Sequence, residues 1–180
     1  MRWNRMPVVA LLALVLAATA LVGTAAGDQA AEKPRPFKIS LEFAGSVIGP
    51  AGSLGCDPGA FPAAMVGGGH ATHLGKFREG LDGLACQNLD TGELTNGSAT
   101  YVAANGDSLA VTFAGQAYVN PDGSYTGEGS GTIIGGSGRF ASASGYWTWT
   151  MTGMFLPDGT TQTELEGNGW IAYDASDRSE

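Results

Sequence analysis

The chain has 180 residues, and its 17 acidic and 9 basic side chains give it a formal net charge of −8 at neutral pH. Nucleic acids and anionic membranes bind surfaces on which Lys and Arg gather, so an acidic chain with scattered cations excludes them as partners. The length is that of one domain, and we expect the excess of acidic residues to serve solubility.

The first 26 residues have the pattern of a signal peptide. Arg2 and Arg5 precede an apolar run that extends from Pro7 to Val22, and small residues follow as far as Ala26. The run has the length of a signal-peptide core and is short for a membrane-spanning helix. We predict cleavage after Ala26; cleavage one residue earlier and an uncleaved anchor are the alternatives. The protein is then secreted or held in the cell envelope, without stable membrane insertion, and begins with a flexible segment at 27–35.

Alternation of apolar and polar residues predicts β-strands throughout 36–173. Three stretches show it most clearly, with apolar faces made of Phe37, Ile39, Leu41 and Phe43, of Leu109, Val111 and Phe113, and of Trp147, Trp149, Met151 and Phe155. The predicted strands are 37–46, 66–79, 83–90, 93–103, 108–118, 124–134, 144–156 and 160–173. A polar tail is expected at 174–180.

Turn signals separate most of these strands. Asn105-Gly106 is a strong hairpin signal because both residues tolerate a positive φ, and 120–124 and 157–160 carry Pro-Asp-Gly turns. Residues 49–63 are predicted to form a long irregular loop. Strands joined in sequence by short turns predict an eight-stranded antiparallel up-and-down barrel, which leaves no exposed edge. A β-sandwich is the alternative.

Cys56 and Cys86 are the two cysteines of the chain. An even number of cysteines in an exported chain predicts a disulfide between them. Closing this loop is worth about 3–4 kcal/mol in the chain-entropy treatment. A catalytic thiol and a metal site are the competing interpretations, and two Cys with two His offer few ligands for a metal.

The glycine-rich stretch "GGSGRF" at 135–140 suggests a phosphate-binding loop. Such loops lead into a helix whose N-terminus faces the phosphate. The residues after Gly145 alternate as a strand does, so no helix is predicted there. We therefore interpret Gly135, Gly136 and Gly138 as a turn of unusual backbone geometry, with Phe140 plugging one end of the barrel.

A family resemblance is carried by three stretches, "GGSGRFASASG" at 135–145, "GHATHLGKF" at 69–77 and "ATYVAANGDSL" at 99–109. They resemble the allene oxide cyclase-like and dirigent-like barrel superfamily, and in particular its exported bacterial members. The resemblance extends over 67–173 and implies the same eight-stranded barrel.

Some bacterial members of that superfamily, the spirotetronate cyclases among them, are cofactor-free enzymes that act on polyketides. The residues that match their motif are Gly138, Arg139, Phe140, Gly145, Trp149, Met151, Thr152 and Gly153. The resemblance implies that Trp149 and Met151 point into the lumen, and strand alternation places Trp147 and Phe155 there as well. With Phe113, these four are the predicted ligand-binding residues. Plant allene oxide cyclases rely on a lumen carboxylate, for which no matching residue is found here.

His73 and Tyr101 are the candidate catalytic residues. His70 and His73 would point to opposite faces of one strand, with His73 inside as a hydrogen-bonded structural side chain or, alternatively, a proton donor or acceptor. We expect Tyr101, Tyr118 and Tyr125 to pack in the barrel wall with their hydroxyl groups at the rim, or to donate hydrogen bonds to a ligand.

Three glutamates are candidates for a paired-carboxylate site. Glu164 and Glu166 share a strand face, and Glu128 lies between glycines. Paired carboxylates act as acid and base when burial raises one pKa. We predict instead that all three lie on the solvated outer face.

Two functions remain. The first is an exported barrel that binds a small apolar molecule in its lumen, or has a structural role if side chains fill the lumen. The alternative is a cofactor-free cyclase or isomerase that folds a flexible substrate against aromatic walls. No metal and no cofactor are predicted.

Overall fold

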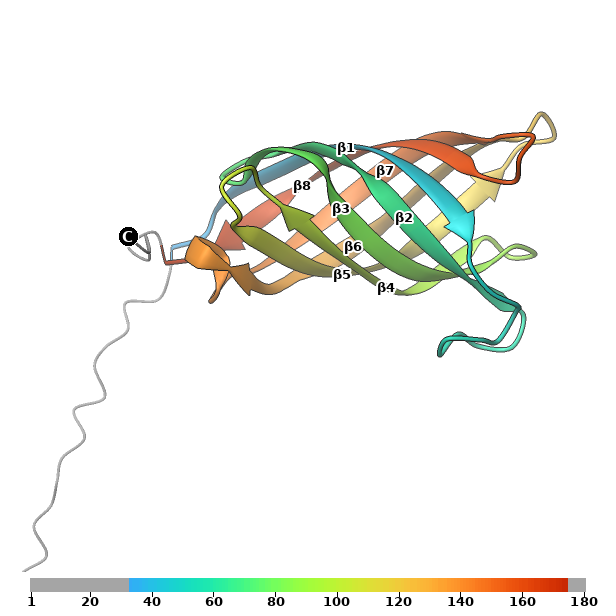
Figure 1. Cartoon of the computed structure of the whole chain (residues 1–180), viewed down its shortest axis with the longest axis horizontal. Coiled ribbons are helices and arrows are strands. Elements are labelled where there is room, and N and C mark those ends of the chain that lie inside the picture. The colour runs from blue at the N-terminus through green and yellow to red at the C-terminus, as the bar shows by residue number, and fades with distance from the viewer. Residues whose placement is uncertain (1–32, 175–180) are drawn as a thin grey trace, which may run out of the picture. The chain divides into compact units, whose positions relative to one another are not determined.

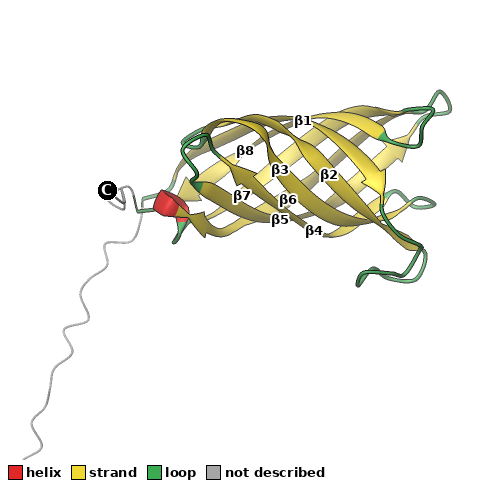
Figure 2. Ribbon diagram, viewed as in Figure 1, coloured by secondary structure: helices red, strands yellow, loops and turns green. Residues whose placement is uncertain are grey.

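The computed structural model describes residues 33–174, which form eight β-strands. Each strand pairs antiparallel with the next in sequence, and β8 pairs with β1, so the sheet closes into a barrel (Figure 1, Figure 2). The strands are β1 (Arg35–Val47), β2 (Ala60–Ala71), β3 (Gly75–Asn88), β4 (Glu93–Val102), β5 (Ser108–Val119), β6 (Ser124–Ser137), β7 (Ser144–Phe155) and β8 (Thr161–Ala172). A turn of 3-10 helix, η1 (Gly138–Phe140), connects β6 to β7. The predicted up-and-down barrel is confirmed, and the alternative β-sandwich is wrong.

Alternation along each strand sends apolar side chains into the barrel and polar ones to its surface. In β1, Phe37, Ile39 and Leu41 are at most 3% exposed, whereas Lys38 and Ser40 between them are exposed. The inward faces predicted for β5 and β7 follow the same rule. A barrel of eight strands is narrow enough for side chains from opposite walls to meet, so residues of all the strands contribute to one core inside it.

The predicted strand 66–79 is wrong, because the chain reverses direction within it. β2 ends at Ala71 and β3 begins at Gly75. His73 in the turn has a φ of 72° and Gly75 a φ of 84°, so left-handed backbone makes a turn that no Asn-Gly or Pro-Gly pair announces. β2 also begins inside the predicted loop 49–63. Pro62 is tolerated because it lies beyond the last pair that β2 forms with β1, Val47 with Ala63.

The other hairpin turns lie where the sequence predicts them. The Gly106 amide donates to the Ala103 carbonyl oxygen at 2.9 Å, so Ala104 and Asn105 are the central residues of this turn. Gly106 has a φ of 89°, whereas Asn105 does not take the positive φ that the Asn-Gly signal predicts. In the turn at 120–123, the hydroxyl of Ser124 donates to the Asp122 carboxylate at 2.6 Å. This hydrogen bond, helped by one from the Ser124 amide, lowers the pKa of Asp122.

Several predictions fall outside the described residues. They are the signal peptide at 1–26, most of the segment at 27–35 and the tail beyond residue 174. Among residues 33–174, no helix has the length and apolar character needed to cross a membrane.

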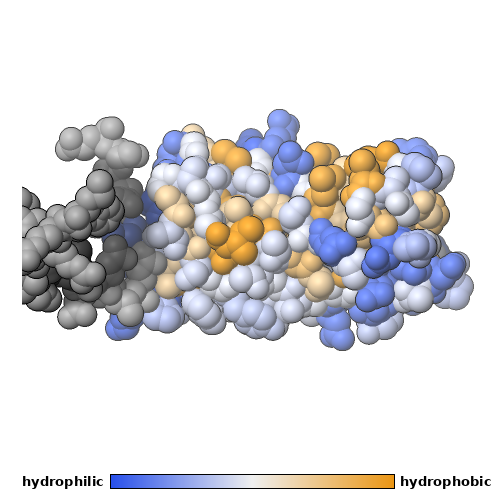
Figure 3. Space-filling view, turned by 90° about the horizontal axis from the view of Figure 1, so that it is seen from below, coloured by the Kyte–Doolittle hydropathy of each residue, from blue (hydrophilic) through white to orange (hydrophobic). Residues whose placement is uncertain are grey.

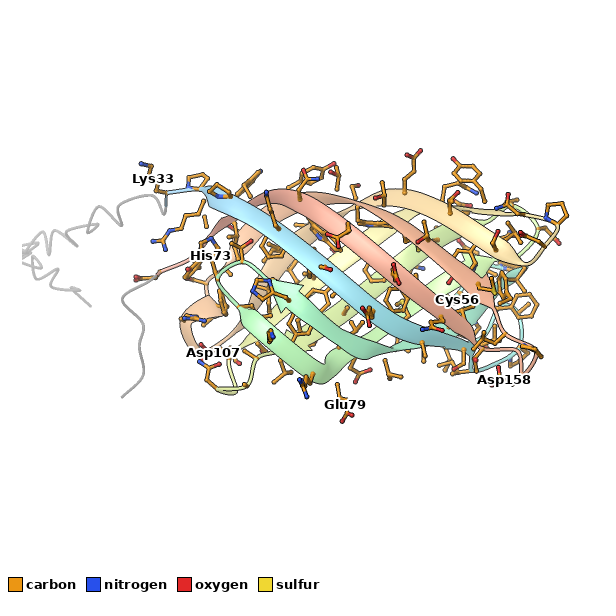
Figure 4. All side chains as sticks on the ribbon, turned by 90° about the horizontal axis from the view of Figure 1, so that it is seen from above. Lys33, Cys56, His73, Glu79, Asp107 and Asp158 are labelled. Carbon is orange, nitrogen blue, oxygen red and sulfur yellow. A yellow bond between two sulfur atoms is a disulfide. The ribbon has the colours of Figure 1, made fainter. Side chains whose placement is uncertain are left out.

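The barrel has a closed end and an open end. At the closed end, the start of β1 and the end of β8 lie beside three loops, which are 72–74, 103–107 and 138–143. The open end is surrounded by four loops, which are 48–59, 89–92, 120–123 and 156–160. In Figure 4, Lys33, His73 and Asp107 mark the closed end, and Cys56 and Asp158 mark the open end.

The turn after β6 plugs the closed end. Phe140 is completely buried, and the guanidinium of the adjacent Arg139 holds two other loops. Its Nε lies 3.2 Å from the Asp107 carboxylate, and a terminal nitrogen donates to the His73 carbonyl oxygen at 2.6 Å. Gly138 has a φ of 57°, and a Cβ there would lie 1.9 Å from an Asp107 oxygen, so this position requires glycine. The closing turn predicted from "GGSGRF" is confirmed for Gly138 and Phe140, whereas Gly135 and Gly136 belong to β6 and pair with Ala110 and Leu109 of β5.

The predicted disulfide between Cys56 and Cys86 is confirmed, with Cα atoms 5.4 Å apart. Cys86 points outward from β3, since its neighbours Ala85 and Gln87 both face the lumen. The two half-cystines and Ala60 form a small buried cluster separate from the main core. The bond therefore holds the loop 48–59 to the outer side of β2 and β3, next to the open end (Figure 1).

Replacing Arg139 with alanine is expected to destabilise the barrel by about 1.5–3 kcal/mol, because a charge-assisted hydrogen bond to one loop and an ion pair to another are lost. Urea unfolding followed by tryptophan fluorescence measures the change. Arg78→Ala is the matched control, since Arg78 is exposed on β3 and no described residue pairs with it. Equal losses in the two variants would show that Arg139 does not join the loops.

Replacing both cysteines with serine is expected to lower the free energy of unfolding by about 3 kcal/mol, because the bond closes a loop across 30 residues of sequence. Calorimetry of the double variant and of the reduced native chain measures the loss. The two should agree, since both lack the same crosslink. An unchanged transition temperature would contradict a structural role for the disulfide.

Candidate functional site

The lumen is filled at the closed end and hollow toward the open end. The hollow is a cavity of about 210 Å³, and every strand contributes to its wall, from Leu41 in β1 to Leu165 in β8. The wall is predominantly apolar. The closed end is sealed by Phe140, so the cavity communicates with solvent through the open end.

The five predicted ligand-binding residues all border this cavity. Trp147, Trp149, Met151 and Phe155 project from β7, and Phe113 projects from β5. The two tryptophans are buried and the other three are partly exposed to the hollow. The inward orientation predicted for these side chains is confirmed. Binding of a ligand by them stays a prediction.

Two other predicted lumen residues lie outside the cavity wall. Leu109 and Val111 are no more than 1% exposed and pack in the filled part of the lumen. They belong to the core that supports the cavity floor.

Glycines on the neighbouring strands make room for the two indole rings. A Cβ at Gly131 in β6 would lie 2.2 Å from Trp147 Nε1, and one at Gly167 in β8 would lie 2.6 Å from Trp147 Cε3. The ring of Trp149 covers Gly129 in the same way, at 2.3 Å from Cζ2. The indole rings therefore lie against the inner wall, over glycine backbone that carries no side chains. Because the rings lie along the wall, the space along the barrel axis stays open.

Three buried polar groups at the cavity have no protein partner. The indole Nε1 atoms of Trp147 and Trp149 donate to no acceptor among the described residues. The Tyr101 hydroxyl also makes no hydrogen bond to a described residue, although the side chain is 2% exposed. Buried donors are usually paired. The two Nε1 atoms are inaccessible from the cavity and lie against the barrel wall, so the Tyr101 hydroxyl is the candidate for contact with a bound molecule.

The other polar pair of the wall is satisfied within the protein. Tyr125 on β6 and Thr163 on β8 are buried, and their hydroxyl groups hydrogen-bond to each other. This pair sits in the wall of the cavity nearer to the open end, beside Phe155, whose ring centroid is 5.3 Å from that of Tyr125. It gives the cavity one fixed polar spot.

The electrostatics of the cavity are those of a neutral pocket. Its described wall contains no Asp, Glu, His, Lys or Arg. Burial raises the pKa of Tyr101 well above its ordinary value, so its hydroxyl stays protonated at neutral pH and acts as a hydrogen-bond donor. No group of three potential metal ligands occurs within 33–174.

Two sequence predictions about individual residues are wrong. His73 does not face the lumen; it lies in the turn between β2 and β3, with Nε2 3.1 Å from the Pro36 carbonyl oxygen and its ring against Tyr173. Tyr118 does not pack in the wall; it points outward from β5 and is 54% exposed. The error at His73 arises from the hairpin missed within 66–79. Tyr118 points outward because strict alternation from the inward Leu109, Val111 and Phe113 places even-numbered residues of β5 on the outer face.

The predicted outer-face position of the three glutamates is confirmed. Glu128, Glu164 and Glu166 are exposed on β6 and β8. They take no part in the lumen cavity.

Sequence reasoning missed the wall that β2, β3 and β4 contribute. Met65, Leu81, Ala85, Ala99 and Gln87 all border the cavity. The alternating pattern in "GLDGLACQ" at 80–87 does indicate which residues of β3 face the lumen. Small and polar residues make that pattern weak, and because the β2–β3 hairpin was missed, the inward and outward positions could not be assigned. These residues lie opposite β7 and complete the pocket.

Comparison with protein-family models, with curated proteins and with solved structures finds no match to this chain. The class of the protein is therefore defined by its own geometry, a small closed β-barrel with an apolar cavity at one end.

Replacing Gly167 with alanine is expected to destabilise the barrel by about 1–3 kcal/mol, because the new methyl group overlaps the ring of Trp147. Trp147→Phe removes the ring atoms that clash, so the double variant should recover part of the loss. Urea unfolding of the wild type, both single variants and the double variant measures the coupling. Strictly additive losses would show that the ring of Trp147 does not lie on Gly167.

Proposed function

We propose that this protein binds a small, mainly apolar molecule in the cavity of its barrel. The observation that carries the proposal is the hollow of about 210 Å³ with its predominantly apolar wall. A dry apolar cavity of about 150 Å³ accepts benzene, and pockets for drug-sized ligands begin at about 300 Å³. The bound molecule is accordingly of one or two small rings, or is the end of a longer apolar chain.

The open end supplies the route of entry. Val47 and Leu89 border the cavity there and are each 47% exposed. Apolar patches also lie toward this end of the barrel on the face shown in Figure 3, where it points to the right. An apolar molecule can therefore pass from solvent to cavity along apolar surface.

The Tyr101 hydroxyl supplies orientation. Tyr101 borders the cavity, is buried and makes no hydrogen bond to a described residue. An acceptor oxygen on the ligand would satisfy this hydroxyl and so would recover free energy that the empty protein lacks, about 1–3 kcal/mol for a buried group. With no charged side chain in the described wall, the ligand is neutral.

We include export in the proposal. A structural disulfide persists in oxidising compartments outside the cytosol, and the first 26 residues have a signal-peptide pattern. The binding site would then operate outside the cell or in its envelope. Kinship with the allene oxide cyclase-like superfamily remains part of the same proposal and rests on the resemblance of sequence stretches.

A cofactor-free cyclase or isomerase is the second candidate, and the Tyr101 hydroxyl is the observation that favours it. A protonated, buried phenol can stabilise negative charge that develops on a substrate oxygen. No carboxylate or histidine borders the cavity among the described residues to act as a base. Binding without reaction is therefore the better supported of the two.

Blocking the cavity tests the binding proposal. Ala63 borders the cavity near the open end, and Ala64 is the next residue, on the opposite face of β2. Ala63→Trp is expected to weaken binding at least 10-fold, whereas Ala64→Trp should leave it unchanged, because only the first indole enters the hollow. Ligand-observed NMR with toluene, indole and 1-hexanol measures binding, and mass spectrometry identifies small molecules that co-purify with each variant.

The result for the wild-type protein and the result for the Ala64→Trp control can each contradict the binding proposal. If the wild-type protein binds none of the three probes and carries no small molecule, the lumen has a structural role only. If Ala64→Trp weakens binding as much as Ala63→Trp, the ligand sits outside the lumen. Conversion of a co-purified molecule to an isomer during incubation, reduced by Tyr101→Phe, would favour the cyclase.

A further inference from the structure

The outer face of the barrel has a second hollow, unrelated to the lumen. It lies across β5, β6, β7 and β8 and extends to Lys38 on β1. Side chains that point away from the core form its sides, and its lining also includes the bare backbone of Gly129 and Gly167 and the residue Trp149, which borders the lumen cavity as well. We call this hollow the outer trough.

Strand register explains why the surface is hollow there. Ser130 on β6 pairs with Thr148 on β7, and both side chains are short, so this row forms the floor. The next row toward the open end carries the longer Glu128 on β6 and Glu166 on β8, both in register with Thr150. Together these rows make one side and the floor of a channel that crosses the strands.

Tyr146 on β7 lines the opposite side of the trough. It pairs directly with Trp170 on β8, which adjoins the trough just outside its lining, and the two side chains are 45% and 42% exposed. The two aromatic residues are therefore neighbours on the outer surface, and both are accessible to solvent. Neighbouring strands are about 4.8 Å apart, so the trough spans about 15 Å from β5 to β8.

The two carboxylates of the trough are not used within the protein, whereas Thr148 and Gln116 donate hydrogen bonds to backbone carbonyl oxygens. The carboxylates of Glu128 and Glu166 pair with no described cation; the ion pair found in 33–174 joins Arg139 to Asp107 at the closed end. The side-chain amide of Asn168 lies beside them in the trough. The trough therefore combines a wall of aromatic rings with a wall of free hydrogen-bond acceptors.

We propose that the outer trough binds a neutral saccharide chain. A sugar ring has an apolar face of C–H bonds that packs on the flat ring of Trp or Tyr, and hydroxyl groups around its edge that donate to carboxylates and amides. Tyr146 and Trp170 supply the first contact, and Glu128, Glu166 and Asn168 supply the second. A channel that crosses several strands suits an extended chain of sugar units better than a single small molecule.

The chemistry of the trough disfavours other ligands. Two unpaired carboxylates repel nucleic acids and acidic polysaccharides. A peptide strand needs an open sheet edge, and the closed barrel offers none among residues 33–174. A neutral, hydroxyl-rich chain satisfies the carboxylates without requiring charge.

Affinity electrophoresis of the secreted wild-type protein in native gels tests this proposal. The gels contain hydroxyethyl cellulose, laminarin, galactomannan or xylan, with an acidic pectin as the charged comparison. We expect retardation in at least one of the neutral polysaccharides and none in pectin. Trp170→Ala and Tyr146→Ala should each reduce retardation at least 5-fold, and Glu166→Gln should reduce it less, since an amide keeps one acceptor.

Tyr118→Ala is the matched control. Tyr118 is an exposed tyrosine that also points outward, but it lies near the open end and outside the trough. Its loss should leave retardation unchanged, and circular dichroism should show the same fold in all variants. Ala63→Trp, which blocks the lumen, should also bind saccharide normally. The proposal of a ligand in the lumen and the proposal of a saccharide in the trough can therefore fail independently of each other. No retardation in any neutral gel, or equal loss in Tyr118→Ala, would overturn the proposal.

Discussion

The pairing of β8 with β1 is the constraint on which the rest of the structure depends. Eleven residues of β1, from Arg35 to Gly45, are in register with β8. This contact joins the two ends of the sheet, so every strand has two neighbours and every backbone edge is paired. Once the sheet is closed, each residue faces either the lumen or solvent, and side chains from the first and the last strand come to share one interior.

Closure also creates a problem of space that the glycines solve. The interior of an eight-stranded barrel is narrow, and two tryptophans on β7 must fit within it. Gly129 and Gly131 on β6 and Gly167 on β8 leave the wall bare where the indoles lie. The rings thus occupy the wall instead of the axis, and the volume that remains along the axis is the cavity. Glycines therefore serve two purposes in this chain, because some form turns and others make room for the indole rings beside the cavity.

The two ends of the barrel differ because their loops differ. At the closed end, Arg139 joins three loops around Phe140, so the core continues to the last turn. At the open end, the longest loop is held to the outer side of the barrel by the disulfide and does not enter the lumen. The result is a pocket with one entrance. The outer trough lies on the other side of the wall, over the outward residues of β5 to β8, and shares only Trp149 with the cavity.

The sequence by itself determined the strand faces and the class of fold. Strict alternation in 37–43, 109–113 and 147–155 sets which side chains are inside, because a strand has a period of two whatever it packs against. The disulfide and the turn at 135–140 follow from local chemistry as well. Tertiary structure alone decided the β2–β3 turn, the position of His73, the contribution of β2 to β4 to the cavity, and the trough. Each depends on which residues of different strands lie opposite one another, and register is a property of the closed sheet that no single strand encodes.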